Sequence, residues 1–426
     1  MSVLSRSLLR IALATVALLP VGLRAAEMPQ DALHHVKPEA CKQCHEEIYQ
    51  QWQSSMHANS SAMKDPIHGA FYRNVAGDPA QEGVTLKANG KFPVCLKCHA
   101  PSAAMDKTTK LDAAEAYANG ITCVNCHSFA AFKGNETPEG KPRYGIDAYH
   151  IDTEALHGPS GNTYTTARVE EGATWPTPIH HPQPLKGSNS AVFESNLACM
   201  GCHEKRGNAH GTPLCVTGKE YAGANSFVNC QSCHMGIVTV PKLKDGQRVE
   251  GEFVTIADHT MGGGHSARMV ERGLAMDMRT EATDQVIKAT VTVRNRLPHA
   301  FPTGAPFRNF FVKVAAYDKD GKELWKNYQV HPIKDDPQAA FWYTLGDAEG
   351  KPSAPPVATQ VLADTRLKPN EARTLAYEIP RTPATAIVRA EALYDLLLPP
   401  IKANVKGKIP DDLLRPKLAA SAEMRF

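Results

Sequence analysis

The sequence has little of three things: aromatic side chains, net charge and long apolar stretches. Phe, Trp and Tyr together make up 7% of the 426 residues, whereas proline and glycine contribute 31 and 30. A compact fold therefore needs buried apolar surface from a source other than aromatic side chains. The formal net charge is only +3, from 47 basic and 44 acidic residues, and gives no support for binding to nucleic acid.

A long apolar stretch occurs only near the N-terminus. Arginines, an apolar run from Ile11 to Leu23 and the small residues Ala25 and Ala26 form a secretory-signal pattern over residues 1–26. The run is too short for a comfortable membrane span, although a retained N-terminal anchor is the alternative. We predict a periplasmic or secreted protein with no membrane span after cleavage. Cleavage would remove three basic and no acidic residues and would take the net charge from +3 to 0.

Ten of the eleven cysteines form five Cys-x-x-Cys-His motifs. In this signature two thiols attach covalently to a porphyrin and the histidine ligates its iron. Disulfides and zinc knuckles also use Cys-x-x-Cys, but neither needs a histidine directly after the second cysteine, and only 18 of the 426 residues are histidine. The motifs predict five covalently attached haem c groups. Covalent attachment of haem to such motifs takes place outside the cytoplasm. Their residues are Cys41, Cys44 and His45; Cys95, Cys98 and His99; Cys123, Cys126 and His127; Cys199, Cys202 and His203; and Cys230, Cys233 and His234.

The spacing of the motifs predicts how they pair. The second and third motifs start 28 residues apart and the fourth and fifth 31 apart, whereas 76 residues separate the starts of the third and fourth. We predict two compact two-haem units, with the first motif as a leader and residues 128–196 as a long ordered loop. The eleventh cysteine, Cys215, is expected to be a buried thiol.

Thirteen histidines lie outside the motifs, more than five irons need as distal ligands. Each could instead be an ordinary loop histidine, and a methionine could replace histidine at an iron. His34 and His35, close to the predicted cleavage site, are expected to be exposed. The predicted distal ligands are His57, His180 or His181 before a proline, and His259 and His265 around three glycines; His299 is either a ligand or a turn residue.

Several segments resemble the multihaem cytochromes c. They are Trp52-x-x-Ser-x-His57-Ala, the stretch from Gly120 to His127, Cys230 to Met235, Gly-Gly-Gly-His265 and His299-x-Phe-Pro-Thr-Gly304. The resemblance is to the tetrahaem cytochrome c of nitrifiers, in the hydroxylamine oxidoreductase superfamily, and to proteins that join such a core to a C-terminal β domain. It implies stacked haem pairs, two histidine ligands at most irons and, in some members, one five-coordinate haem. The chain departs from ammonia-forming nitrite reductase, in which one motif ends in lysine, and it has no match to the cross-linking tyrosine of hydroxylamine oxidoreductase.

From about Thr280 the apolar residues alternate with period two, which is typical of strands. We predict a mainly α and loop multihaem cytochrome c domain at 27–279, an all-β immunoglobulin-like sandwich at 280–398 and an extended or partly disordered tail at 399–426. The expected strands are 286–294, 310–317, 372–379 and 386–394, and helices are expected at 46–52, 110–119 and 266–278.

These features predict electron transfer along a chain of covalent haems. The expected partners are redox proteins, either other cytochromes or a quinol-linked membrane donor, and no nucleic acid. Two alternatives remain. One is an oxidoreductase that acts on a small nitrogen or sulfur oxyanion at a five-coordinate haem, and the other is a subunit of an extracellular cytochrome filament. Whether the chain is an enzyme depends on an open coordination position, as at a catalytic metal site.

Overall fold

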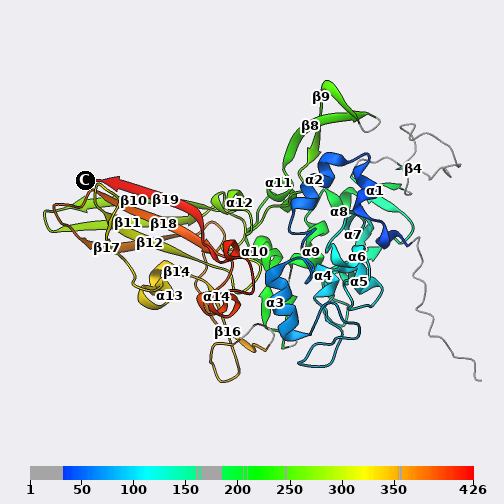
Figure 1. Cartoon of the computed structure of the whole chain (residues 1–426), viewed down its shortest axis with the longest axis horizontal. Helices are drawn as coiled ribbons and strands as arrows, with labels where there is room; N and C mark the ends of the chain where they lie inside the picture. The colour runs from blue at the N-terminus through cyan, green and yellow to red at the C-terminus, as the bar shows by residue number, and fades with distance from the viewer. Residues whose placement is uncertain are drawn as a thin grey trace, which may run out of the picture.

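The computed structural model describes residues 32–159, 163–164, 185–204, 206–208, 210–244, 247–353, 355 and 357–426. The short helices that carry the motifs, together with short hairpins, form one end of the molecule, and long strands form the other (Figure 1). We call residues 32–273 the motif region and residues 274–426 the β region. None of the helices formed by the described residues is long and apolar enough to cross a membrane.

The motif region is built from short helices. Pro38, Pro66 and Pro101 each stand at the start of one, where the missing N–H is tolerated. The helix expected at 46–52 is confirmed, but 110–119 contains only a short helix at Glu115–Ala118. The helices are η1 (Leu33–His35), α1 (Pro38–Lys42), α2 (Glu46–Ser54), α3 (Pro66–Val75), α4 (Leu96–His99), α5 (Pro101–Met105), α6 (Glu115–Ala118), α7 (Cys123–His127), η2 (Gly145–Ala148), α8 (Ser190–Phe193), α9 (Leu197–His203), α10 (Thr217–Gly223), α11 (Cys230–His234) and α12 (Ala267–Glu271).

Short strands join these helices. The described part of 128–196, expected to be a loop, contains strands and the helices η2 and α8. A hairpin that the sequence did not predict follows the fifth motif and projects from the molecule (Figure 1). The strands are β1 (Phe129–Phe132), β2 (Tyr149–Ile151), β3 (Leu156–Gly158), β4 (Thr163–Tyr164), β5 (Leu185–Ser188), β6 (Arg206–Gly207), β7 (Pro213–Cys215), and the hairpin strands β8 (Ile237–Lys244) and β9 (Gln247–Ala257).

The β region forms two main antiparallel sheets within its described residues. One has the order β10-β11-β17, and the other has β13-β12-β18-β19 with β14 beside β12. All four predicted strands are confirmed, as β11, β12, β17 and β18. The elements are β10 (Leu274–Ala282), β11 (Val286–Asn295), β12 (Asn309–Tyr317), β13 (Glu323–Lys326), α13 (Pro332–Asp335), η3 (Pro337–Ala339), β14 (Ala340–Phe341), β15 (Tyr343–Gly346), β16 (Gln360–Asp364), β17 (Ala372–Pro380), β18 (Ile387–Asp395), α14 (Pro399–Val405), η4 (Asp411–Leu414) and β19 (Lys417–Arg425).

Alternate residues of these strands build one apolar core. Val291 on β11, Leu375 on β17, Val314 on β12 and Ala390 on β18 are at most 1% exposed and belong to the same cluster. Period-two alternation places every second side chain on one face, so the two sheets bury their inner faces together. The antiparallel β domain is therefore confirmed, and its immunoglobulin-like topology stays a prediction.

Two predictions for this part of the chain are wrong. Of the helix expected at 266–278 only α12 forms, and the chain continues as β10, paired with β11 from Leu274 to Ala282. The tail after Pro399 is ordered: it forms α14 and η4 and ends in β19, which pairs with β18. The β region therefore starts at Leu274 and not near Thr280, and it includes the tail.

The two regions contact each other at several places, and two of these contacts bear on the site described below. Phe71 on α3 stacks on Phe307 with the ring centroids 4.7 Å apart. Glu220 on α10 forms an ion pair with Arg366, with 2.8 Å between Oε1 and Nη1, and both side chains are 11% exposed. The second contact holds the loop that contains His299 against the motif region.

Candidate functional site

Each Cys-x-x-Cys-His motif lies on a turn of helix. In the second motif the His99 N–H donates to the Cys95 carbonyl over 3.0 Å, and in the first the His45 N–H donates to that of Cys41 over 2.9 Å. Residues three and four apart lie on the same face of a helix, so both thiols and the imidazole point to one side. Each of the eleven cysteines is a thiol and not half of a disulfide, which argues against the disulfide alternative.

Three motif imidazoles have the tautomer that an iron ligand needs. Nδ1–H of His99 donates to the Ser60 carbonyl over 3.1 Å, and that of His234 donates to the Gly262 carbonyl over 2.7 Å. His127 donates in the same way to the carbonyl of His157 over 2.8 Å. A proton on Nδ1 leaves the lone pair on Nε2, and such backbone partners fix the ring orientation of metal-binding histidines.

Four histidines outside the motifs hold their Nδ1 proton in the same way. Three of them donate to backbone carbonyls: His68 to Ser60 and His259 to Ala257, both over 2.8 Å, and His299 to Ala300 over 2.9 Å. The fourth, His57, donates to the sulfur of Met261 over 2.8 Å. These four histidines are therefore the best-oriented candidates for distal ligands.

Two of these four face motif histidines at the separation that a shared iron requires. The ring centroids of His57 and His203 are 6.2 Å apart, and those of His234 and His299 are 6.5 Å apart. A metal ion lies about 2 Å from each imidazole nitrogen that it binds, so two rings on opposite sides of one ion have centres about 6 Å apart. For His234 and His299 the tautomers and the spacing would fit one haem iron bound by both rings. For His57 and His203 the spacing and the tautomer of His57 would fit in the same way.

Comparisons with known proteins identify the family of the chain. Residues 40–128 match the family model for cytochrome c554 and c-prime. No curated protein matched the chain. The crystal structure of a penta-heme cytochrome c552 from Thermochromatium tepidum is 44% identical and covers 93% of this chain and 100% of its own, with a TM-score of 0.81. The chain belongs to the multihaem c-type cytochromes.

Two other solved structures align with parts of this cytochrome. A β-glucosidase from Kluyveromyces marxianus is 13% identical over 36% of this chain and 14% of its own, with a TM-score of 0.15. A CARDB domain from Pyrococcus furiosus is 12% identical over 36% of this chain and 84% of its own, also with a TM-score of 0.15. Scores of this size have no bearing on the fold of the cytochrome.

The distal candidates of the cytochrome are neutral near pH 7. Burial, followed by the nearby His234, lowers the pKa of His57 to about 4. Burial, followed by the cations Arg308 and Lys417, lowers the pKa of His265 to about 4 as well. Burial also lowers the pKa of His259. Only the neutral ring can ligate a metal, so these shifts favour iron binding.

The motifs do not pair entirely as their spacing predicts. The side chains of Cys41 and Cys123 are within hydrogen-bonding reach of each other, so the third motif lies against the first and not only near the second. The side chains of Cys199 and Cys230 meet in the same way, which joins the fourth and fifth motifs as expected. The first motif is therefore one half of a pair and not a separate leader.

The sequence reasoning missed His68, which lies in the first turn of α3. A Cβ at Gly69 would come within 2.6 Å of the Ala62 carbonyl, so glycine lets this turn pack closely against the segment just before the helix. His68 and His99 share the Ser60 carbonyl, and their ring centroids are only 4.2 Å apart. The two rings lie side by side and not on opposite sides of one iron.

The other predicted residues have mixed outcomes. His180, His181 and the signal pattern at 1–26 lie outside the described residues. His34 and His35 are not exposed as expected, because both donate to Asp106. Cys215 is half-buried, with its sulfur 3.8 Å from the Thr217 hydroxyl.

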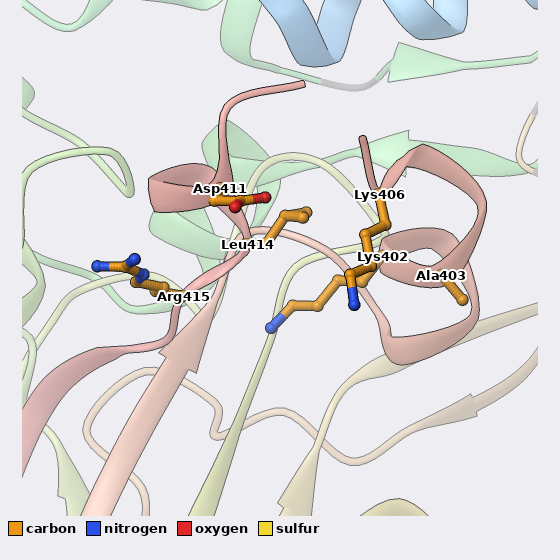
Figure 2. Close-up of a pocket in the computed structure, with 6 residues that line it drawn as sticks. All are labelled: Lys402, Ala403, Lys406, Asp411, Leu414 and Arg415. Carbon is orange, nitrogen blue, oxygen red and sulfur yellow. The ribbon is translucent and has the colours of Figure 1, made fainter. Parts of the chain in front are cut away.

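A pocket of about 370 Å³ lies far along the chain from the motifs, between α14 and η4 (Figure 2). Three of the six side chains that surround it are basic, and none belongs to a motif or to a distal candidate. It is therefore not part of the haem-binding constellation. Its lining residues are Lys402, Ala403, Lys406, Asp411, Leu414 and Arg415.

Proposed function

We propose that this chain is a periplasmic or secreted pentahaem c-type cytochrome that transfers electrons. The number five rests on the five motifs and on the relative described as a penta-heme cytochrome. The location rests on the secretory pattern at residues 1–26 and on the extracytoplasmic chemistry of haem attachment.

The observation that carries this proposal is the pair of facing imidazoles at two motifs. His57 and His203, and likewise His234 and His299, have ring centroids 6.2 and 6.5 Å apart. A haem iron held by two imidazoles exchanges single electrons between its ferric and ferrous states. Two strong protein ligands leave no position for a substrate, so these sites suit electron transfer and not catalysis.

Different groups of the protein would have different roles at such a haem site. The cysteine thiols would hold the porphyrin covalently, and the motif histidines would each supply one nitrogen to its iron. Backbone carbonyls, such as that of Gly262 for His234, hold the ring in the correct tautomer and orientation. Glu220 accepts hydrogen bonds from the Ala300 N–H over 3.1 Å and the Thr303 hydroxyl over 2.7 Å, which orients the loop that carries His299.

Mass spectrometry and paramagnetic resonance test the proposal. Protein from a host that matures cytochromes c should carry the added mass of five haems, and most of its irons should be low-spin. His299→Ala should convert one iron from low-spin to high-spin, because an imidazole ligand is lost. His210→Ala, at an exposed histidine, is the matched control and should leave every signal unchanged. Fewer than five haems, or an unchanged spectrum in His299→Ala, would contradict the proposal.

A second candidate function is an oxidoreductase that acts on a small nitrogen or sulfur oxyanion. It is favoured at the second motif, because His68 lies beside His99 at 4.2 Å and not opposite it. If the iron there is five-coordinate, the wild-type protein should show a high-spin signal, and nitric oxide should bind to the reduced form. Uniform low-spin signals with no binding of nitric oxide would exclude this function.

We also propose that the electron partners are another cytochrome or a quinol-linked membrane donor. Kinship with the hydroxylamine oxidoreductase superfamily stays a prediction from sequence resemblance. Assembly into an extracellular filament is likewise a prediction, and electron microscopy of the purified protein would reveal it.

A further inference from the structure

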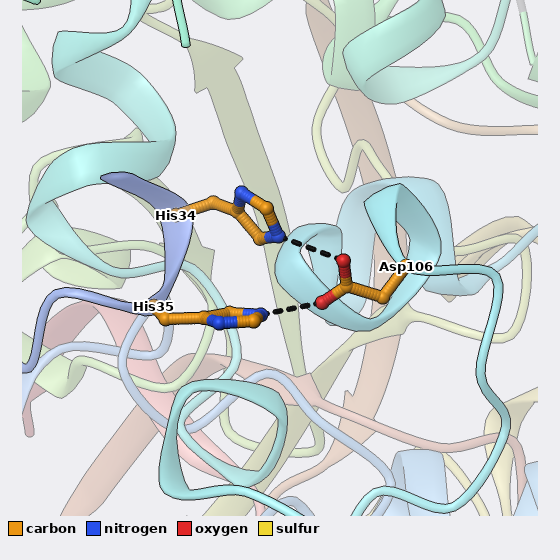
Figure 3. Close-up of side chains that lie close together, drawn as sticks. All are labelled: His34, His35 and Asp106. Carbon is orange, nitrogen blue, oxygen red and sulfur yellow. Dashed lines mark hydrogen bonds and ion pairs between the residues drawn. The ribbon is translucent and has the colours of Figure 1, made fainter. Parts of the chain in front are cut away.

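A cluster of side chains that could bind a metal lies near the start of the described chain, beside the second and third motifs but made of none of their residues. It consists of His34 and His35 on η1 and Asp106, which directly follows α5. His34 Nε2 lies 2.9 Å from Asp106 Oδ1, and His35 Nε2 lies 2.5 Å from Oδ2. Both imidazoles point at the two oxygens of one carboxylate (Figure 3). The ligand atoms that the three residues can offer all lie within 4.8 Å of one another.

These histidines differ from the candidate iron ligands in the nitrogen that they use. His68, His259 and His299 direct Nδ1 at a backbone carbonyl. His34 and His35 instead direct Nε2 at a carboxylate. Their Nε2 atoms therefore converge on Asp106, and the cluster needs an explanation other than iron ligation.

The surrounding residues hold the cluster in place. The Tyr117 hydroxyl donates to Asp106 Oδ2 over 2.6 Å. The Ser102 hydroxyl donates to the His34 carbonyl over 2.9 Å, and the Asn125 side-chain amide donates to Ser102 over 3.0 Å. Hydrogen bonds behind the ligands are what keep metal-binding side chains in a productive geometry. The side chains of His34 and His35 are only 15% and 12% exposed, so they are also partly shielded from water.

We propose that His34, His35 and Asp106 bind a divalent transition-metal cation of the zinc, nickel or copper class. Imidazole and carboxylate ligands suit these metals. Two neutral histidines and one carboxylate supply one negative charge, so other ligands would balance the rest of the charge of the divalent ion. Metal–nitrogen and metal–oxygen bonds are about 2.0 to 2.2 Å long, so neighbouring ligand atoms around an ion lie about 3 to 3.5 Å apart. The two histidine–aspartate pairs need to separate by less than about 1 Å to reach that spacing. Each ring would bind with its proton moved to Nδ1.

Such an ion would join parts of the chain that belong to different motifs. Leu33, beside His34, is buried against Val124 of the third motif, and Asp106 follows the helix after the second motif. Asn125 of the third motif reaches the cluster through Ser102. The cation would therefore fix the segment before the first motif onto the helices of the next two.

Metal analysis of the haem-loaded protein tests the proposal, with zinc as the probe. The protein is dialysed against a metal-buffered zinc solution, and zinc is measured by plasma mass spectrometry with the haem iron of the same sample as reference. We expect one zinc per chain in the wild type. Asp106→Asn should weaken zinc binding at least tenfold, since it removes a charged ligand and changes little in shape. His150→Ala, at an exposed histidine of β2, is the matched control and should bind zinc as the wild type does.

Two further readouts separate this inference from the proposed function. An unchanged Soret band and haem mass in Asp106→Asn would show that the fold and haem attachment are intact, so that a loss of zinc reports on the site itself. Equal zinc binding by the wild type and Asp106→Asn would overturn the metal site and would leave the haem count untouched. A change in the low-spin iron signals of His34→Gln or His35→Gln would also overturn it, because that histidine would then be an iron ligand.

Discussion

The two regions of the molecule bury apolar side chains in different ways. Among the described residues the largest cluster has 27 buried residues, of which 25 lie in the β region and two, Ile67 and Val270, come from the motif region. A small second cluster of three lies in the β region as well. The motif region has four separate clusters of three to nine buried residues each. A single core can stabilise a domain by itself, whereas small clusters bury too little area for that. The difference indicates that the motif region depends on its porphyrins for apolar contact and that the β region does not.

The largest effect should appear when haem attachment is prevented. In a host without cytochrome maturation, we expect the motif region to lose its protease resistance and the β region to keep it. Limited proteolysis with mass spectrometry should then give a stable fragment that starts near Leu274, while the haem-loaded protein stays largely intact. If both regions are digested at the same rate, the contrast between their cores is wrong.

Removal of a large side chain from the β core should have the next largest effect. Phe310 is 0% exposed and stacks on Phe341 with the ring centroids 4.2 Å apart. We expect Phe310→Ala to lower the free energy of unfolding of the β region by about 3 to 5 kcal/mol. Denaturant unfolding followed by tryptophan fluorescence would measure this. Val357→Ala, at a residue that is 51% exposed, is the control and should change stability little.

A smaller effect is expected at the contact between the regions. Glu220→Gln keeps the shape of the side chain but removes the more buried of the two carboxylates that pair with Arg366, the other being that of Asp364. We expect the protein to lose about 2 kcal/mol of stability. The high-spin fraction should also rise, because the loop that carries His299 is held less firmly. Glu349→Gln, at an exposed residue, should change neither quantity.

The smallest expected effect is a loss of folding stability at acid pH. Burial alone would raise the pKa of Glu82, but hydrogen bonds from Thr108, Thr109 and neighbouring backbone N–H groups lower it below its ordinary value of 4.5. Because the folded-state pKa is depressed, the stability that Glu82 contributes is complete above pH 4.5 and is lost as the pH falls below that value. The side chain is exposed, so the loss should be below about 1 kcal/mol.

Unfolding curves at about pH 6 and about pH 3.5 would measure this, with Glu82→Gln showing a weaker pH dependence than the wild type. Backbone N–H groups, that of Val330 first, lower the pKa of Asp335 in the β region in the same direction. Asp335→Asn should therefore reduce the acid sensitivity of the β region alone. Identical pH dependence in the wild type and both variants would contradict this account.

Much of the molecule could be predicted from the sequence because the motifs and the strand patterns each lie within a short stretch of the chain. The five motifs are covalent signatures, and strands such as β11 alternate branched apolar with polar residues over their whole length. The errors occur where a partner strand decides the conformation. β10 and β19 are rich in Ala, Met, Leu and Glu, which favour helix, yet each pairs along its length with a neighbouring strand. Tertiary pairing outweighs such weak propensities.

The distal candidates were harder to place than the motifs because no fixed spacing links them to a motif. His57 was predicted as a ligand, but the sequence did not indicate that it faces His203, 146 positions further along the chain. His68 has no motif of its own, and its role depends on a shared carbonyl at Ser60. Only the folded chain brings such residues together, as it does for His34, His35 and Asp106.

The position of His299 makes the two regions interdependent for a reason other than stability. This histidine belongs to the β region, yet its ring faces His234 on α11 of the motif region. A chain shortened to its Cys-x-x-Cys-His motifs would keep all ten attachment sulfurs but would lack the imidazole opposite His234. The β region thus supplies the imidazole that lies nearest the histidine of the fifth motif, so a change in the β region alone can alter the surroundings of that motif.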